Sequence, residues 1–392
     1  MREVVIVSGA RTPIGDFMGS LKDHSAVQLG TIALKAAIER AGIQPDMIDE
    51  VTAGHVYQAG CKGNPARQVG MYAGCPVETV CVTINQQCPS SMRGAEILSQ
   101  QIMLGKIDIG AAVGHESMTN IPHLLLKARF GYRMGGTQVE DSMMYDAFID
   151  AFNNYHAGVT AENLVDMYKI PRQEADEWGL MSNQRACKAI AEGKFKEEIV
   201  PVEIKTKKGP AIFDTDEHPN PNVTMEGLAK LKPAFKKDGI ITAGNASAIN
   251  DGGAAIILMG ADKAKELGVK PLARIVATAS ASVDPKIMGI GVVPAVRRVL
   301  NFAKMSMDDI ELWEMNEAFA AQVIACNREL KVDVGKINVL GSGVSLGHPV
   351  GMTGVRLIVT LLHEMRRSKK QFGCATLCAG GGPAMATIIE AL

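Results

Sequence analysis

The sequence lacks several features that would assign a chain to a specialised class. Aromatic residues make up 5% of its 392 residues, charged residues make up 21%, and the formal net charge is −1. Such a balance gives nucleic acid or an anionic membrane surface little electrostatic reason to bind. No apolar run approaches the roughly 20 residues that a membrane-spanning helix needs. We therefore expect neither nucleic acid nor a membrane as a partner.

The cysteines also lack the spacing that indicates a structural metal. The chain has 8 cysteines, and no two of them form a C-x-x-C pair. We therefore expect no metal site. A run that reads as a strand, Val4–Val7, follows the first three residues almost at once, so we expect no export or transit segment. Reduced thiols and a cytoplasmic location fit this pattern.

One cysteine stands out because of its local context. Cys88 lies in N-Q-Q-C-P-S-S-M-R-G, between a mostly β-branched run at 79–84 and a helical pattern at 93–104. A cysteine at such a strand-to-helix turn faces a helix N-terminus, whose dipole and free N–H groups favour a thiolate over a thiol. The context predicts that Cys88 is a nucleophile, although a buried cysteine is more often a small hydrophobic residue.

Three further polar motifs occur on turns elsewhere in the chain. They are G-H-P-V-G at 347–351, C-A-G-G-G at 378–382 and N-E-A-F at 316–319. Each alone is more often structural than catalytic. Together with Cys88 they indicate one assembled active site.

The first and last thirds of the chain repeat the same order of elements. An expected helix at 27–42, closed by Gly42, corresponds to a helix at 295–304. The strand at 79–84, Cys88 and the helix at 93–104 correspond to a strand at 337–340, His348 and a helix at 353–366. Strands at 107–114 and 372–378 follow. A nearly constant offset of roughly 255–270 residues indicates a duplicated half-domain, which would bring Cys88 and His348 to facing turns.

The alternation of strands and helices predicts an α/β fold whose central strands, such as Ala111–Val113, are buried on both faces. We expect an N-terminal half at 1–118 together with 249–270, a C-terminal half at 271–392, and an inserted loop domain at 119–248. The insertion is basic, contains an expected helix at about 172–192, and is long enough to be a functional cap over a phosphorylated ligand.

The chemistry of the motifs fits acyl transfer through a thioester. His348 is the base that a Cys88 nucleophile needs at neutral pH. Cys378 offers a second thiol for moving a proton. The glycines after it, Gly380 among them, let backbone N–H groups approach a reacting oxygen, as in an oxyanion hole. Asn316 is suited to hold a water or to donate to a carbonyl oxygen.

These residues resemble the thiolase family, in particular its acetyl-CoA acetyltransferase branch, over essentially the whole chain. The similar segments include V-V-I-V-S-G-A-R-T-P-I-G at 4–15, N-P-A-R-Q at 64–68, T-A-G-N-A-S at 242–247 and M-G-I-G at 288–291, besides N-E-A-F and G-H-P-x-G. The resemblance implies a five-layered αβαβα fold and a homodimer or homotetramer. It implies CoA thioesters as substrates and no cofactor, since coenzyme A is itself a substrate.

The resemblance also implies a role for each motif residue. Cys88 would be acylated, His348 would activate it, and Cys378 would remove the α-proton of acetyl-CoA. Asn316 would fix a water in one oxyanion hole, and the N–H groups of Cys88 and Gly380 would form the other. Two condensing molecules of acetyl-CoA would give acetoacetyl-CoA and CoA, or thiolysis would run in reverse. Contacts with coenzyme A are expected from the insertion and its surroundings: His156, Phe235, Ala243, Ser247 and Phe319.

The chain departs from the family pattern at several turns and in the acyl pocket. Ser91 replaces a usual glycine, and the segments at 340–343 and 382–384 are altered. Ala157 stands where methionine is common, opposite Met288 in the expected acyl pocket. Either the pocket is roomier than in a strict acetoacetyl-CoA enzyme, or a bulky neighbour fills the gap.

Three other functions compete with this interpretation. A longer-chain 3-ketoacyl-CoA thiolase has the same chemistry and a different pocket. A decarboxylating ketoacyl synthase shares the fold, but such enzymes lack the second thiol that Cys378 supplies. A non-catalytic binding protein of the same fold would explain the altered turns, but it has no need of Cys88, Asn316, His348 and Cys378 together.

Overall fold

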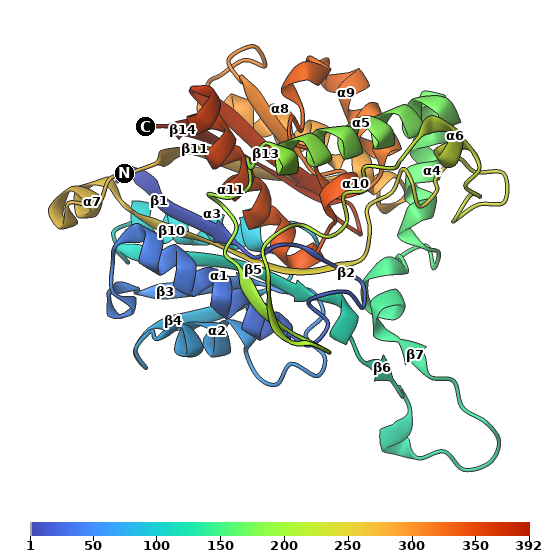
Figure 1. The fold of residues 1–392 in the computed structure, drawn as a ribbon, viewed down its shortest axis with the longest axis horizontal. Coiled ribbons are helices and arrows are strands. Elements are labelled where there is room, and N and C mark those ends of the chain that lie inside the picture. Colours follow the sequence, from blue (N-terminus) through green and yellow to red (C-terminus); the bar gives the residue numbers. More distant parts are fainter. Residues whose placement is uncertain (1) are drawn as a thin grey trace.

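The computed structural model describes residues 2–392. A mixed β-sheet carries helices on its faces (Figure 1). The strand order is β12-β13-β14-β11-β1-β10-β5-β3-β4. The short pairing of Val5 and Ile6 in β1 with Arg274 and Ala273 in β11 joins two half-sheets. Each half-sheet belongs to one of the two repeats.

The N-terminal half-sheet brings together strands that are far apart in the sequence. Antiparallel pairing joins β1 to β10 and β10 to β5, and parallel pairing joins β5 to β3 and β3 to β4. Its strands are β1 (Val4–Arg11), β3 (Glu50–Gly54), β4 (Val80–Ile84), β5 (Ile109–Ser117) and β10 (Asn250–Gly260), with the short β2 (Gly15–Asp16) beside β10. All residues of β1 and β5 are buried, as expected for strands covered on both faces.

The C-terminal half-sheet repeats this pattern with four strands. Parallel pairing joins β12 to β13, and antiparallel pairing joins β13 to β14 and β14 to β11. The strands are β11 (Ala273–Ser282), β12 (Leu312–Met315), β13 (Phe372–Cys378) and β14 (Pro383–Ala391).

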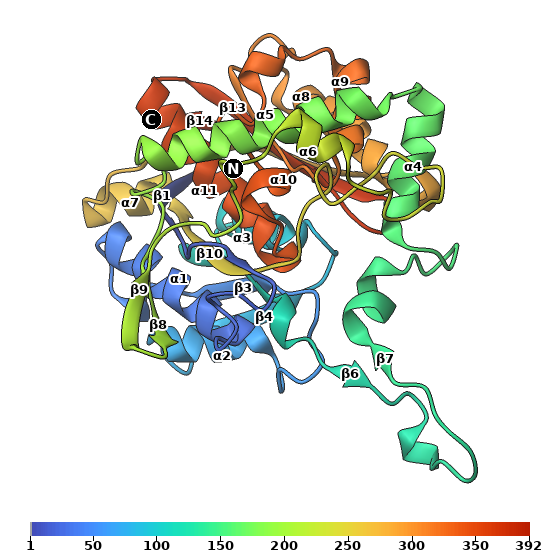
Figure 2. The same cartoon turned by 45° about the vertical axis from the view of Figure 1, so that its right-hand side comes forward.

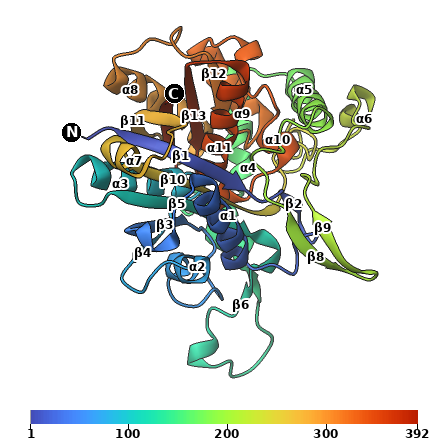
Figure 3. The same cartoon turned by 60° about the vertical axis from the view of Figure 1, so that its left-hand side comes forward.

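Helices form three layers around the two half-sheets. On the outside of the N-terminal half lie α1 (Ala26–Ala41) and α2 (Pro65–Ala73), and on the outside of the C-terminal half lie α8 (Val292–Ala303) and α9 (Ala320–Leu330). Between the half-sheets lie α3 (Ser90–Met103) and α11 (Val350–Ser368), which contact each other and both halves (Figure 3). The expected five-layered αβαβα arrangement is confirmed.

The alternation of side chains along β1 shows why the layers hold together. Val4 and Ile6 face the interior core, with α3 and α11, while Val5 and Val7 face the outer core, with α1. The period of two along a strand thus supplies apolar surface to two layers at once. Helix α1 has the expected limits because Ser25 forms a capping box with Gln28 and Gly42 ends the helix at φ 67°.

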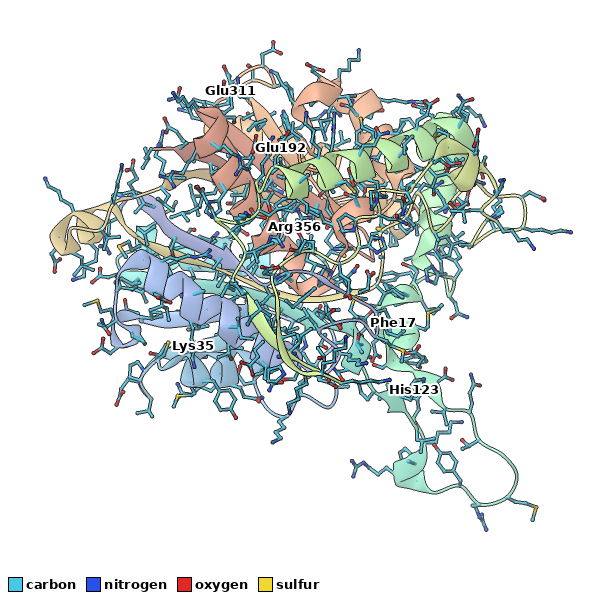
Figure 4. The ribbon with its side chains drawn as sticks, in the orientation of Figure 1. Phe17, Lys35, His123, Glu192, Glu311 and Arg356 are labelled. Atoms are coloured by element: carbon cyan, nitrogen blue, oxygen red, sulfur yellow. The ribbon has the colours of Figure 1, made fainter. Side chains whose placement is uncertain are left out.

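The region between the halves lies against both halves and also projects outward. A hairpin of β6 (His123–Leu124) and β7 (Glu140–Asp141) leaves the body, with His123 at its base (Figures 2 and 4). Helical segments follow at Met144–Phe148 (η4), α4 (Ala157–Tyr168) and α5 (Arg172–Ala191), then β8 (Val202–Thr206), β9 (Gly209–Phe213) and α6 (Met225–Ala229). The remaining short elements are η1 (Pro45–Met47), η2 (Met118–Asn120), η3 (Ala128–Phe130), α7 (Ala261–Leu267), η5 (Pro285–Gly291), η6 (Val334–Lys336) and α10 (Gly343–Leu346).

One expected strand is wrong. Residues 337–340 form a turn, with a single bridge between Ile337 and Trp313. Asn338 has the positive φ of 48°, which ends any strand there. Its side chain instead continues the pairing: Oδ1 accepts from the Met315 N–H at 2.8 Å, and Nδ2 donates to the Met315 carbonyl at 2.7 Å. An amide side chain thus takes the place of a strand residue beside β12.

Candidate active site

Cys88 lies on a tight turn between β4 and α3, as expected. The residue before it, Gln87, has φ 57°, a left-handed conformation that turns the chain sharply. The hydroxyl of Ser90 accepts from the Gln86 N–H at 2.8 Å and donates to the Gln87 carbonyl, which fixes the turn. Helix α3 begins two residues after Cys88, so the sulfur lies at its N-terminal end.

The resting state of Cys88 differs from the thiolate that the sequence suggests. Burial raises the pKa of the Cys88 thiol to about 12, although the backbone N–H groups of Gly380 and of Cys88 itself act in the opposite direction. Desolvation therefore outweighs the helix N-terminus. Cys88 is a thiol at neutral pH and needs a base at the moment of reaction.

His348 supplies a neutral imidazole beside this cysteine. Burial and, to a smaller extent, the positive charge of Arg356 together lower the pKa of His348 to about 3. Its Nδ1 lies 2.7 Å from the Thr353 hydroxyl, which donates its one proton to the Pro349 carbonyl at 2.9 Å. The hydroxyl must therefore accept from Nδ1–H, which leaves the lone pair of the ring on Nε2.

Two buried side chains position the turn that carries His348. Asn250, at the start of β10, accepts from the His348 N–H at 3.0 Å. Glu116, at the end of β5, accepts from the Gly351 N–H at 3.0 Å. Glu116 also accepts from the N–H groups of Val56 at 3.0 Å and Tyr57 at 3.2 Å. Residues of the N-terminal half thus hold the base of the C-terminal half in place.

Asn316 lies against His348 and keeps one oxygen free. Its Nδ2 is 3.3 Å from His348 Nε2 and donates to the lone pair there. Its Oδ1 is buried and has no hydrogen-bond partner within residues 2–392. A buried acceptor without a partner is costly unless a water or substrate occupies it. This geometry suits the expected role of Asn316 in holding a water.

The segment after Asn316 is anchored by a buried network. Glu317 accepts from Trp178 Nε1 at 3.0 Å, from Ser182 at 2.7 Å and from Asn338 Nδ2 at 2.9 Å. It also accepts from the Val344 N–H at 3.2 Å. Helix α5 of the inserted region therefore fixes the loop that carries Asn316.

Cys378 ends β13 and is 1% exposed. Burial raises the pKa of its thiol well above the ordinary value, and a thiolate at Cys88 would raise it further. The two sulfurs are therefore electrostatically coupled, and Cys378 holds its proton at neutral pH. Such a thiol can act as a base only after it has given up this proton.

An apolar cavity of about 230 Å³ joins the insertion to both halves. Most of the predicted site residues line it: Cys88, His348 and Gly380 from the halves, and His156, Ala157, Phe235, Ser247, Met288 and Phe319 around them. Asn316 and Cys378 lie behind this lining, at His348 and Cys88 respectively. Ala243 is exposed and does not line the cavity.

Aromatic rings form one wall of the cavity. His156 stacks on Phe235, with ring centroids 4.4 Å apart and planes inclined by 16°, and Phe235 meets Phe319 edge to face at 6.0 Å. His156 is also the N-cap of α4, because its Nδ1 accepts from the Gly158 N–H at 2.9 Å. A Cβ on Gly158 would lie 2.2 Å from the Phe235 ring, so the stack requires glycine there.

The residues predicted to form the acyl pocket share the cavity with bulky neighbours. Ala157 and Met288 both line it, and so do Met144 and Phe148 from η4. The Phe148 ring lies 5.5 Å from the His156 ring. Two bulky side chains therefore stand close to the space that Ala157 leaves.

The turns at which the sequence departs from the family pattern form specific hydrogen bonds. Ser91 accepts from the Val355 N–H at 3.0 Å and donates to the Met352 carbonyl at 3.3 Å, so its hydroxyl joins α3 to the first turn of α11. Ser342 accepts from Arg356 at 3.1 Å in the interior, where Figure 4 labels Arg356. Pro383 opens β14, and its carbonyl accepts from the Ala379 N–H at 2.8 Å.

Four residues support the site but lie in no local motif that reveals their partners: Thr353, Asn250, Glu116 and Asn338. Thr353 offers the one usable signal, a hydroxyl five residues after a histidine at the start of a helix. The other three act on segments that are between 21 and 235 residues away along the chain. The site brings together two thiols, a neutral imidazole and backbone N–H groups, which are the groups that the predicted acyl transfer needs.

Comparison with known proteins agrees with this geometry. The family description "Thiolase, N-terminal domain" matches residues 4–262, and "Thiolase, C-terminal domain" matches residues 269–391. An acetyl-CoA acetyltransferase of Syntrophomonas wolfei is 50% identical over the full length of both chains.

Solved structures give the same picture. The structure of an acetyl-CoA acetyltransferase from Syntrophomonas wolfei superposes with a TM-score of 0.98 at 47% identity, covering 100% of both chains. Human mitochondrial 3-ketoacyl-CoA thiolase superposes with a TM-score of 0.97 at 40% identity, covering 100% of this chain and 99% of the other. The duplicated α/β halves, the convergence of two cysteines, a histidine and an asparagine, and these full-length matches together show that the chain belongs to the thiolase family.

Proposed function

We propose that the chain is an acetyl-CoA acetyltransferase, which condenses two molecules of acetyl-CoA to acetoacetyl-CoA and CoA and catalyses the reverse thiolysis. The observation that carries this proposal is the arrangement at Cys88. A neutral His348, with its lone pair on Nε2, shares the apolar cavity with the thiol, and Asn316 and Cys378 adjoin it. Full-length relatives named acetyl-CoA acetyltransferase support the same activity.

The first half-reaction is acylation of Cys88. His348 Nε2 takes the thiol proton, and the thiolate attacks the carbonyl carbon of acetyl-CoA. The N–H groups of Cys88 and Gly380, which already act on this sulfur, are suited to stabilise the developing oxyanion. CoA leaves as its thiolate and takes the proton of the Cys378 thiol, so that Cys378 becomes a thiolate and His348 stays an imidazolium.

The second half-reaction forms the carbon–carbon bond. The Cys378 thiolate takes the α-proton of a second acetyl-CoA, whose thioester oxygen is stabilised by the Nε2–H of the His348 imidazolium and by a water on Asn316. The resulting carbanion attacks the acyl carbon on Cys88, and the Cys88 thiolate leaves and recovers its proton from the imidazolium. The high pKa of the buried Cys378 thiol makes its thiolate a strong base, as removal of a weakly acidic C–H proton requires.

Coenzyme A would approach along the inserted region. The His156–Phe235 stack and Ser247 line the cavity that leads to Cys88, together with Phe319. These residues and Ala243 remain predicted contacts. CoA thioesters are substrates in this scheme, and the expectation of no metal and no cofactor stays a prediction, as does a cytoplasmic location. Within residues 2–392, no helix is both apolar enough and long enough to span a bilayer.

The acyl pocket favours short substrates over the longer-chain alternative. Its volume of about 230 Å³ is shared between the acyl group and the end of the thioester arm. Pockets for drug-sized ligands are larger, about 300–1,000 Å³. The buried second thiol at Cys378 likewise disfavours a decarboxylating ketoacyl synthase.

A homo-oligomer is also part of the proposal. Edge strand β4 has no neighbour beyond it in the sheet, and its Val80 and Val82 are 56% and 42% exposed. The β6–β7 hairpin exposes further apolar side chains at its far end, among them Phe130 and Met134, which are 87% and 99% exposed. Exposed sheet edges and apolar loops of this kind are normally covered. Light scattering coupled to gel filtration distinguishes a monomer from a dimer or tetramer.

The activity test compares two substrates in one assay. CoA-dependent cleavage of acetoacetyl-CoA is measured beside that of 3-ketohexanoyl-CoA, with Cys88→Ala as the control. Cleavage of the short substrate that disappears in the control supports the proposal, and the ratio between substrates defines the chain-length preference. Folded protein that cleaves neither substrate contradicts the proposal, and release of carbon dioxide from a malonyl thioester identifies a synthase instead.

A further inference from the structure

A second and larger cavity lies apart from the site at Cys88. Its volume is about 970 Å³, and its walls include His55, Tyr57, Cys61 and Lys62 from the loop after β3. The start of α1, α2 and the segment at 117–122 complete it. It shares no lining residue with the acyl-transfer cavity. The acyl-transfer mechanism uses none of its side chains.

Three chemically active side chains form a chain at the wall of this cavity. The sulfur of Cys61 lies 4.0 Å from His55 Nε2, and the same nitrogen lies 3.1 Å from Glu116 Oε1. His55 is 1% exposed and Glu116 is 0% exposed, whereas Cys61 is partly exposed to the cavity. A nucleophile, an imidazole and a carboxylate thus meet where the sulfur remains accessible.

The charges around His55 make it a cation at neutral pH. Burial alone would lower its pKa, but the negative charge of Glu116 and the contact with Cys61 raise the pKa of His55 to about 9. The ring of His115 packs on His55 at 4.5 Å, and burial together with the charge of His55 lowers the pKa of His115 well below the usual range, so His115 stays neutral. Glu116 and Cys61 are therefore the charged partners of this imidazolium.

The position of the imidazolium gives Cys61 two alternative partners. As a thiol it donates to the Tyr57 carbonyl, 3.7 Å away. As a thiolate it faces the positive ring of His55. The positive ring, 4.0 Å from the sulfur, stabilises negative charge on it, and the thiolate is the nucleophile in disulfide exchange. His55 Nδ1 is buried without a hydrogen-bond partner in residues 2–392, so the charge of the ring is shared between Glu116, 3.1 Å from Nε2, and the Cys61 sulfur.

We propose that Cys61 is a second reactive thiol, separate from the acyl-transfer site, which forms a mixed disulfide with a low-molecular-weight disulfide that enters this cavity. The cavity volume is within the range of pockets that hold small molecules. The reaction needs no oxidant besides the disulfide itself. The site is thus a modification site, and its ligand class is the disulfide of a small thiol.

The exchange is balanced as follows. The Cys61 thiolate attacks one sulfur of the disulfide, a sulfur–sulfur bond forms to Cys61, and the original sulfur–sulfur bond breaks. The electron pair of the broken bond leaves with the second small thiol, which takes a proton from solvent. Cys61 is oxidised, the transferred small thiol stays at the disulfide level in the mixed disulfide, and the other small thiol is the reduced product.

The size of the effect has an upper limit. At neutral pH an ordinary cysteine is only a few per cent thiolate, so full deprotonation raises the thiolate population by about 30-fold at most. Nucleophilicity falls as the pKa falls, which reduces this gain. We therefore expect Cys61 to react about three- to tenfold faster than an ordinary cysteine of similar exposure.

The experiment uses oxidised glutathione on the folded, full-length protein with Cys88→Ala, which removes the catalytic thiol as a competitor. Peptide mass spectrometry follows the mixed disulfide at Cys61 and at Cys187, a partly exposed cysteine on α5, in the same sample. The matched variant is His55→Gln, which keeps a polar side chain without the positive charge. Cys61→Ser checks the assignment of the modified peptide.

The expected result is faster modification at Cys61 than at Cys187, and a fall to the rate of Cys187 in His55→Gln. Thermal unfolding establishes that the variant remains folded. Equal rates at the two cysteines, or an unchanged Cys61 rate in folded His55→Gln, would overturn the proposal. Modification of Cys61 only after denaturation would overturn it as well. None of these outcomes depends on acetyl-CoA acetyltransferase activity.

Discussion

Replacing Thr353 by valine tests whether its hydroxyl selects the tautomer of His348. The hydroxyl accepts from Nδ1–H at 2.7 Å and donates to the Pro349 carbonyl at 2.9 Å. Valine has nearly the same shape but accepts nothing, which leaves a buried ring N–H without a partner. The ring then gains by moving its proton to Nε2, where Asn316 Oδ1 lies free to accept after rotation of the amide. That tautomer cannot deprotonate Cys88.

The magnitude follows from the lost hydrogen bond. A buried donor left without its partner costs about 1–3 kcal/mol. If that energy is the difference between the tautomers, the acylation rate constant falls about 5- to 150-fold. Binding of acetyl-CoA should change little, because Thr353 does not line the cavity.

The assay measures acylation of Cys88 in a single turnover. Protein is mixed with excess acetyl-CoA, quenched in acid, and the mass of the intact chain gives the acylated fraction with time. Thr353→Ser keeps the hydroxyl and should restore most of the rate. Acylation of Thr353→Val at the wild-type rate, or an equal defect in Thr353→Ser, would refute the proposed tautomer control. Comparison of the thermal midpoints separates this effect from a loss of folded protein.

Three further predictions concern pH, chain length and stability. The pKa of His348 is lowered to about 3 and that of Cys88 is raised to about 12, so neither group changes its charge between pH 5 and pH 9. The single-turnover acylation rate should therefore vary less than about threefold in that window. A steep loss of this rate near pH 6.5 would contradict the prediction. Ala157→Met should reduce cleavage of 3-ketohexanoyl-CoA relative to acetoacetyl-CoA, because a pocket-filling side chain changes discrimination between such substrates by roughly 1–3 kcal/mol. Identical chain-length profiles of wild type and variant would show that Met144 and Phe148 already fill the gap beside Ala157. Arg11→Met should lower the free energy of unfolding by about 3–5 kcal/mol. The reason is that it leaves the buried Glu198 and Asp216 carboxylates without the guanidinium that lies 2.6 Å from each. If calorimetry finds an unchanged thermal midpoint, both carboxylates take up protons at little cost.

The elements with strong local signals could be predicted from the sequence. Helix α1 has its capping box and its closing Gly42, and β13 is an apolar run that occupies the expected residues 372–378. The pairing of Cys88 with His348 followed from the duplication, since equivalent turns of two related halves meet. That long-range inference required no detailed contact.

The failures share one cause, which is dependence on distant partners. The apolar run at 337–340 has the composition of a strand, but the Asn338 side chain makes the contacts with Met315 that a strand backbone would make. The Cys88 turn has the features that lower a thiol pKa, but the surrounding protein removes the water that a thiolate needs. Thr353 and Glu116 act through geometry that no spacing encodes.

The placement of α3 and α11 between the two half-sheets has a consequence for the newly made chain. Cys88 and α3 emerge early in synthesis, whereas His348, α11 and β13 are among the last parts to leave the ribosome. Until α11 packs beside α3, Cys88 has no base, and the Ser91 hydroxyl lacks the Val355 N–H from which it accepts a hydrogen bond. An incomplete chain therefore carries an inert thiol, and the catalytic group becomes reactive toward thioesters only when the last layers have closed around it.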